Sequence, residues 1–202
     1  LLAGILTVPG YFRPLKEALQ LRYEAAGMGE VSFKECFPYG TFKVGMVKQL
    51  MEVQHDIRLS PSKSARAIGG RSASAVVLKD EGMGKRIFIG HSAGGIAASQ
   101  AFDLLWRQQR LEIERSILIG SPKVRMSPHV SERSLYIVQR KRWRKDWFSY
   151  FGIWDKHLPS ERIEVSTLGR HADYFRDYEP YLSEQGSNLE LTVNEIWRCL
   201  TK

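Results

Sequence analysis

Short apolar runs alternate with longer amphipathic segments along most of this chain. The runs are apolar on both sides rather than on alternate positions, which is typical of strands buried within a mostly parallel sheet. We expect strands at residues 4–8, 31–36, 86–90, 117–120, 134–139 and 162–165.

The amphipathic segments carry apolar residues at spacings of three and four, as one face of a helix does. They predict helices at residues 14–26, 44–57, 62–78, 92–109 and 189–200. Strands that alternate with helices predict an α/β fold, with a mostly parallel sheet covered by helices on both faces. In such sheets the functional site lies at the carboxyl ends of the strands.

The length and composition are those of one globular domain. The chain has 202 residues, 43% of them hydrophobic and 26% charged, and we expect a single domain over 1–202. No apolar run is long enough to cross a bilayer, and we interpret the opening LLAGILTVPG as a core strand rather than a signal peptide. Two cysteines, Cys36 and Cys199, favour reduced thiols in a cytoplasmic protein, with a single bridge between them as the alternative.

The strongest chemical signal is the sequence GHSAGG at residues 90–95, between an apolar run and a helical segment. It has the form G-x-S-x-G, in which a serine occupies a sharp turn from strand to helix. The flanking glycines remove the Cβ atoms that would clash across such a turn. Ser92 would then lie at a helix N-terminus, where backbone N–H groups stabilise developing negative charge. The competing interpretation is a helix start with Ser92 as its N-cap.

In these residues and in the order of its elements, the chain resembles the α/β-hydrolase family, in particular its short lipases and esterases with little or no lid. The resemblance implies acyl transfer through a serine nucleophile, an acid and a histidine, in that chain order. It implies a minimal cap, because only 14 residues lie between Gly120 and Leu135. Serine acyl transfer needs no cofactor or metal, so none is expected.

The resemblance also implies two backbone donors for an oxyanion hole. One is the N–H of the residue after the nucleophile, here Ala93. The other comes from a loop after an early strand, where this chain has Pro9-Gly10-Tyr11. Tyr11 is the matching donor and Phe12 the next, although Pro9 replaces a histidine of the family pattern. An ordinary Pro-Gly turn is the alternative.

Five histidines are candidates for the base: His55, His91, His129, His157 and His171. The family places its base after a late strand and before the final helix, which is the position of His171. The ring of His91, inside the turn itself, is expected to point away from the reaction centre.

The acid should follow the strand at 134–139 and precede the one at 162–165. Asp146 and Asp155 both satisfy this order, and Asp146 is favoured because 25 residues separate it from His171, enough for a helix and a strand. Asp155 remains the alternative, and Glu132 and Glu161 are remote candidates.

A net charge of +8 is concentrated in part in one run, RKRWRK at residues 140–145. Such a run is either a solvated loop or a cationic rim that attracts an anionic acyl substrate or lipid surface. The residues that would make this anionic contact are Arg140, Lys141, Arg142, Arg144 and Lys145. Nearby aromatic residues predict either core or an acyl-binding wall: Trp143, Trp147, Tyr150, Phe151 and Trp154.

The sequence therefore predicts a serine hydrolase that cleaves carboxylic esters, of small-molecule or lipid type. A thioesterase or an amidase with the same triad is an alternative, because a triad does not identify the bond it cuts. A catalytically inactive basic binding protein of the same fold is another. No helix-turn-helix, RNA-binding or zinc pattern is present, so specific nucleic acid binding is not expected. No lysine follows the glycines at the spacing of a phosphate-binding loop.

Overall fold

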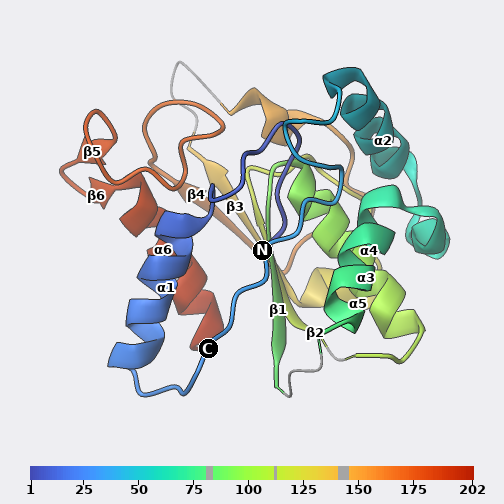
Figure 1. Cartoon of the computed structure of the whole chain (residues 1–202), viewed down its shortest axis with the longest axis horizontal. Coiled ribbons are helices and arrows are strands. Elements are labelled where there is room, and N and C mark those ends of the chain that lie inside the picture. Colours follow the sequence, from blue (N-terminus) through green and yellow to red (C-terminus); the bar gives the residue numbers. More distant parts are fainter. Residues whose placement is uncertain (81–83, 112, 141–145) are drawn as a thin grey trace.

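The centre of the molecule is a parallel sheet whose four strands follow one another in space as they do in the chain (Figure 1). The structure is a computed structural model that describes residues 1–80, 84–111, 113–140 and 146–202. The strands, all paired in parallel, are β1 (Arg86–His91), β2 (Ile113–Ile119), β3 (Ser134–Gln139) and β4 (Glu161–Val165). Their carboxyl ends share one edge, so the loops that follow them converge there.

Two extended segments continue this sheet beyond β1. Leu2 bridges Gly90 on one side and Cys36 on the other, both in parallel. The sequence placed strands at 4–8 and 31–36, and this was wrong, since only Leu2 and Cys36 make these isolated bridges. The first extended segment ends early because Gly4 already lies against Ser92, so the chain turns away from the sheet there.

Helices cover both faces, which confirms the α/β class with a parallel sheet between helical layers. Figure 1 shows α1 (Arg13–Ala25) and α6 (Asn188–Leu200) on one side of the sheet, and α3 (Ile68–Leu78) and α4 (Ala93–Arg107) on the other. Successive strand residues alternate between the two cores: Ile117 and Ile119 join the core with α1 and α6, whereas Leu118 joins the core with α4.

Several elements differ from the sequence pattern. The helix expected at 62–78 is divided into a 3₁₀ helix, η1 (Pro61–Arg66), and α3, because buried Asp56 accepts hydrogen bonds from the N–H groups of Ile68 and Gly69 and starts a new helix there. Further elements that the pattern did not predict are α5 (Pro128–Glu132), η2 (Trp147–Tyr150), β5 (Leu182–Ser183) and β6 (Gly186–Ser187). The remaining helix, α2 (Met46–Arg58), agrees with the expected one within two residues.

Cys36 and Cys199 are both buried and free, so the bridge considered as an alternative does not form. In the part of the chain that the structure describes, no helix combines the length and the apolar character needed to span a membrane.

Candidate active site

Ser92 lies at the junction between β1 and α4, in a backbone conformation that side chains rarely adopt. Its φ of 58° and ψ of −133° are unusual for any residue with a Cβ. The Ser92 N–H donates to the carbonyl of Ile119 at 3.0 Å, and the Ser92 carbonyl accepts from Gly95 N–H at 3.0 Å. Strand and helix thus hold the strained residue from both sides, and no side-chain cap hydrogen bond from Ser92 to α4 is present.

The glycines around Ser92 are required by close backbone contacts. A Cβ at Gly90 would lie closer than 3.0 Å to the backbone of Gly94 and Gly95. A Cβ at Gly94 would also lie closer than 3.0 Å to the carbonyl of Leu2, and one at Gly95 would lie closer than 3.0 Å to the Ser121 side chain. The glycines therefore do what the sequence predicted: they allow strand, turn and helix to approach one another tightly.

The structure brings His171 and Asp146 together, although 25 residues separate them in the chain. His171 Nδ1 lies 2.6 Å from Asp146 Oδ1, and both side chains are largely buried. Asp146 caps η2 at the carboxyl end of β3, and His171 lies in the loop after β4. The second carboxylate oxygen of Asp146 accepts from the Tyr174 hydroxyl at 2.8 Å.

These contacts keep the Asp146 carboxylate ionised. Burial alone would raise its pKa, but the hydrogen bond and charge of His171 and the hydrogen bond from Tyr174 outweigh burial, so the pKa lies below its usual value. Burial and the adjacent carboxylate raise the pKa of Tyr174 well above its usual value, so its hydroxyl remains a donor. The pair therefore has the charge distribution that orients an imidazole and stabilises its protonated form.

The other ring nitrogen of His171, Nε2, is buried and has no hydrogen-bond partner within the described residues. This is the nitrogen that would receive a proton from a serine. No hydrogen bond between it and Ser92 Oγ occurs in the described structure. Hydrogen bonds between catalytic groups often shorten only when substrate binds.

His91 lies against His171, rather than away from the reaction centre as expected. The two rings are 4.8 Å apart between centroids, and His91 Nε2 lies 2.9 Å from the backbone carbonyl of His171. Burial, reinforced by the charge of His171, lowers the pKa of His91 to about 3, so its ring is neutral at neutral pH. A neutral ring that donates from Nε2 fits this contact, and it fixes the backbone that carries His171.

Tyr11 also contacts this loop, but through its hydroxyl and not through its backbone. The hydroxyl donates to the Ala172 carbonyl at 3.1 Å and lies 3.4 Å from His91 Nε2. Its N–H donates to the Val8 carbonyl at 3.3 Å, within a turn. The structure thus contradicts the assignment of Tyr11 as an oxyanion donor. The cause is the early end of the first extended segment, which brings Gly4 rather than Gly10 to the serine.

Gly4 and Ala93 are the backbone neighbours of the Ser92 side chain. A Cβ at Gly4 would lie 2.6 Å from Ser92 Cβ and 2.9 Å from its Oγ, so only glycine leaves room for the serine. Ala93 is the first residue of α4, and helix geometry leaves the N–H groups of the first turn without partners inside the helix. The Ala93 N–H thus stays the predicted donor.

The other sequence candidates lie elsewhere. Asp155 is exposed, and its carboxylate accepts from the Lys156 backbone. Glu161 binds Arg198 and Lys202, and His129 binds Asp103 and Ser127. Of the basic run, Arg140 is exposed, whereas Lys141, Arg142, Arg144 and Lys145 lie outside the described residues, as does Trp143.

Sequence reasoning missed Gly4, Tyr174 and the role of His91. Gly4 could have been predicted by ending the first strand at Ala3, because a glycine then directly follows the apolar run Leu-Leu-Ala. Tyr174 had no signal, because only the fold brings it to Asp146. Among the residues described, no cluster of three or more His, Cys, Asp or Glu side chains could hold a metal ion.

Comparisons of the chain with models of protein families, with curated proteins and with solved structures gave no match. What the site can do therefore follows from the chemistry of Ser92 and of the His171–Asp146 pair.

Proposed function

We propose that this protein is a serine hydrolase of the α/β-hydrolase type that cleaves carboxylic esters through an acyl-enzyme. The observation that carries the proposal is the pairing of Asp146 with His171 at 2.6 Å, with the His171 ring against His91, the residue that precedes a serine in a strained turn between strand and helix. Strain of this kind persists where a function requires it, and a structural N-cap would need none.

The proposed reaction begins when Ser92 Oγ attacks the ester carbonyl and His171 Nε2 takes the serine proton. Asp146 stabilises the imidazolium that results. As the tetrahedral intermediate collapses, His171 returns the proton to the leaving alcohol and the acyl group remains on Ser92. Water, activated by His171 in the same way, then releases the acid and restores the serine.

The oxyanion that forms in both steps needs two aligned donors. We assign one to the N–H of Ala93, at the start of α4. The second is assigned to the N–H of Ile5, which follows Gly4 in the loop against Ser92. The next N–H along the chain, that of Leu6, is not available to an oxyanion, because it donates to Gln49 Oε1 at 2.8 Å.

The test is the hydrolysis of p-nitrophenyl esters of increasing acyl length by the wild type and by Ser92→Ala. We expect the variant to lose at least about 10⁴-fold in kcat, as loss of a serine nucleophile does elsewhere, while its circular dichroism is unchanged. A fluorophosphonate probe should label the wild type at Ser92 and leave the variant unlabelled. Equal activity of the two proteins, or labelling at another residue, would contradict the proposal.

The same experiment separates the alternatives of the same class. Thioesters and amides offered beside the esters show which bond is cleaved fastest, since the triad itself does not decide this. A basic binding protein without catalysis would leave Ser92 unlabelled and would bind an anionic polymer with a steep dependence on salt. The free, buried thiols of Cys36 and Cys199 support a reducing compartment, and we propose the cytoplasm as its location.

A further inference from the structure

Helix α2 carries large apolar side chains on its outer face, whereas its inner face buries two polar residues beside the apolar Val53 and Ile57. Val47 and Met51 are 66% and 60% exposed, and Met46 and Leu50 are exposed as well. Gln49 and Asp56, by contrast, are fully buried. A helix on the surface of a globular protein normally carries polar residues on its outer face, so the apolar residues on the outer face of α2 require an explanation.

Specific hydrogen bonds fix α2 in this orientation. The Gln49 amide receives the N–H of Leu6 at 2.8 Å and donates to the carbonyls of Thr41 and Val44. Asp56 accepts from the Tyr39 hydroxyl at 3.0 Å and from the start of α3. Rotating α2 to bury its outer apolar residues would separate these buried polar groups from their partners, which is destabilising.

The exposed apolar face of α2 continues toward the candidate active site. Leu6 and Val8, in the loop that begins at Gly4, are exposed, and so is Phe42 just before the helix. The backbone of Phe42 is hydrogen-bonded to Thr7 at 3.3 Å, so loop and helix form one unit. Figure 1 shows α2 at the upper end of the sheet, where the strands have their carboxyl ends.

A second group of exposed apolar side chains lies near His171 of the candidate site. Trp147 and Phe151 are exposed and contact each other at 5.2 Å between ring centroids. Phe148, between them in sequence, lies 5.1 Å from the ring of His171. Apolar surface thus borders both the serine loop and the histidine of the candidate site.

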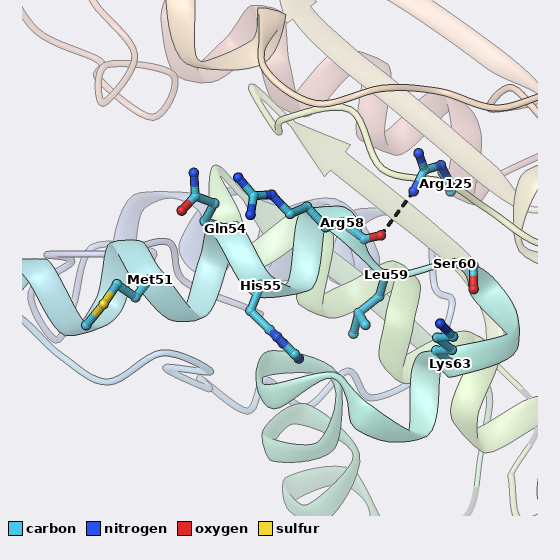
Figure 2. Close-up of a pocket in the computed structure, with 8 residues that line it drawn as sticks. All are labelled: Met51, Gln54, His55, Arg58, Leu59, Ser60, Lys63 and Arg125. Atoms are coloured by element: carbon cyan, nitrogen blue, oxygen red, sulfur yellow. Dashed lines mark hydrogen bonds between the residues drawn. The ribbon is translucent and has the colours of Figure 1, made fainter.

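Toward its end, the outer face of α2 changes from apolar to cationic. On the turns after Val47 and Met51 the same stripe carries Gln54 and Arg58, at helical spacings of three and four. Beside them is a hollow of about 500 Å³, lined in Figure 2 by eight described residues, none of them acidic: Met51, Gln54, His55, Arg58, Leu59, Ser60, Lys63 and Arg125. Arg125 donates to the Arg58 carbonyl at 3.0 Å, which draws a third cation to the end of the helix.

We propose that α2 is a docking helix for a negatively charged lipid surface. Its first two turns would enter the boundary between headgroups and acyl chains, as the apolar faces of interfacial helices do. Arg58, Lys63 and Arg125 would contact anionic headgroups, whose chemistry complements the cationic hollow. The net charge of +8 favours the same surface over a neutral one.

Docking in this way also specifies a substrate class, and in this respect it rests on the proposed function. Through Gln49 and Leu6, α2 is joined to the loop that contacts Ser92, so a docked helix places the serine at the lipid boundary. The esters that reach it there are lipid esters with medium or long acyl chains.

The test is flotation of the full chain with vesicles of phosphatidylcholine, with and without phosphatidylglycerol. We expect binding to the anionic vesicles only, weakened by salt. The double variant Val47→Ser, Met51→Ser should lower the partition coefficient at least about tenfold. Arg58→Gln with Lys63→Gln should lower it about fivefold for each cation removed.

Matched controls keep the comparison specific. Leu21→Ser with Met28→Ser removes two exposed apolar side chains near the end of α1, and Lys79→Gln with Arg110→Gln removes two exposed cations elsewhere. These variants should bind as the wild type does. Hydrolysis of a soluble p-nitrophenyl butyrate should be unchanged in all four, since none touches the triad.

The proposal is overturned if neutral vesicles bind equally well, or if the α2 variants float like the wild type. It is also overturned if size-exclusion chromatography shows a dimer that Val47→Ser, Met51→Ser converts to a monomer, because a second copy would then cover the helix. Charge-dependent flotation of a protein that hydrolyses no ester would support docking and contradict the proposed function.

Discussion

The two halves of the candidate triad are built in different ways. Ser92 is held by its immediate neighbours in the chain: β1 before it, α4 after it, and the glycines at 90, 94 and 95 that permit their close contact. Asp146 and His171 lie in two loops, after β3 and β4, and side-chain hydrogen bonds join them. The first half depends on space that only glycine leaves, whereas the second depends on polar partners from distant segments.

This difference predicts how each half fails. A change in the turn at Ser92 should act as a steric defect with a large effect on both folding and activity. A change among the polar partners of His171 should leave the fold in place and reduce activity in steps. Four substitutions, from the largest expected effect to the smallest, test this contrast.

Gly94→Ala should have the largest effect. Its Cβ would meet the Leu2 carbonyl, a backbone atom that cannot move without disrupting the contact between the first extended segment and β1. We expect the free energy of unfolding to fall by about 3 kcal/mol, the upper range for overpacking, and fluorophosphonate labelling of Ser92 to disappear. Gly45→Ala, where nothing lies within 4 Å of the added Cβ, is the control for urea unfolding and labelling. Similar behaviour of the two variants would show that the turn is not sterically limited.

Asp146→Asn should reduce kcat by about 10⁴-fold, because the amide favours the wrong tautomer of the base. The fold should remain, since the amide has the shape of the carboxylate and its oxygen still accepts the hydrogen bond from the Tyr174 hydroxyl. Asp155→Asn, at the exposed alternative, should stay within about twofold of the wild type in the same ester assay. If the two variants exchanged these results, the assignment of the acid would be reversed.

His91→Phe should lower kcat about tenfold, because the His171 carbonyl loses its partner while the ring contact with His171 is retained. His91→Gln keeps an N–H donor and should recover part of this loss, with KM unchanged in both. A larger loss in the Gln variant than in the Phe variant would mean that the ring contact, and not the hydrogen bond, is what matters at this position.

The same histidine predicts a pH dependence of stability. The pKa of His91 is about 3 in the folded protein and 6.5 in the unfolded chain, so the unfolded chain binds the extra proton between these values. Stability due to a neutral His91 is therefore complete above pH 6.5 and falls as the pH drops toward 3, by up to about 1.4 kcal/mol per pH unit. In urea unfolding between pH 7 and 4, the free energy of unfolding of His91→Gln should lack this pH-dependent loss. The difference in unfolding free energy between the wild type and this variant should therefore narrow as the pH falls. A constant gap over that range would argue against a buried neutral ring.

Tyr174→Phe should have the smallest effect on activity. The variant removes one of the hydrogen bonds that lower the pKa of Asp146, and we expect a severalfold loss in kcat/KM. The pKa of the carboxyl should rise, so the acid limb of the pH profile of kcat/KM should move to higher pH. The Gln139 N–H also loses its acceptor, which should lower the free energy of unfolding by about 1–3 kcal/mol. An unchanged acid limb would show that Tyr174 supports the fold without tuning Asp146.

The sequence by itself determined the elements whose signals are local. The apolar runs of β1 and β3 and the spacing within α1, α4 and α6 predicted their positions within a few residues, because neighbouring residues decide such patterns. The turn at Ser92 was equally clear, since its glycines adjoin the serine in the chain. His171 and Asp146 followed from their order relative to the strands, and the structure places those two side chains in contact.

Only the tertiary structure decided the features that depend on distant segments. It ended the first extended segment at Ala3, since Gly4 meets Ser92 from across the sheet, and so moved the candidate oxyanion loop away from Tyr11. It turned His91 toward His171 and brought Tyr174 to Asp146. It also placed Gln49 and Asp56 on the buried side of α2, because their amide and carboxylate have partners in other segments. Periodicity records which residues share a face, but the hydrogen-bond partners of that face decide whether it is buried.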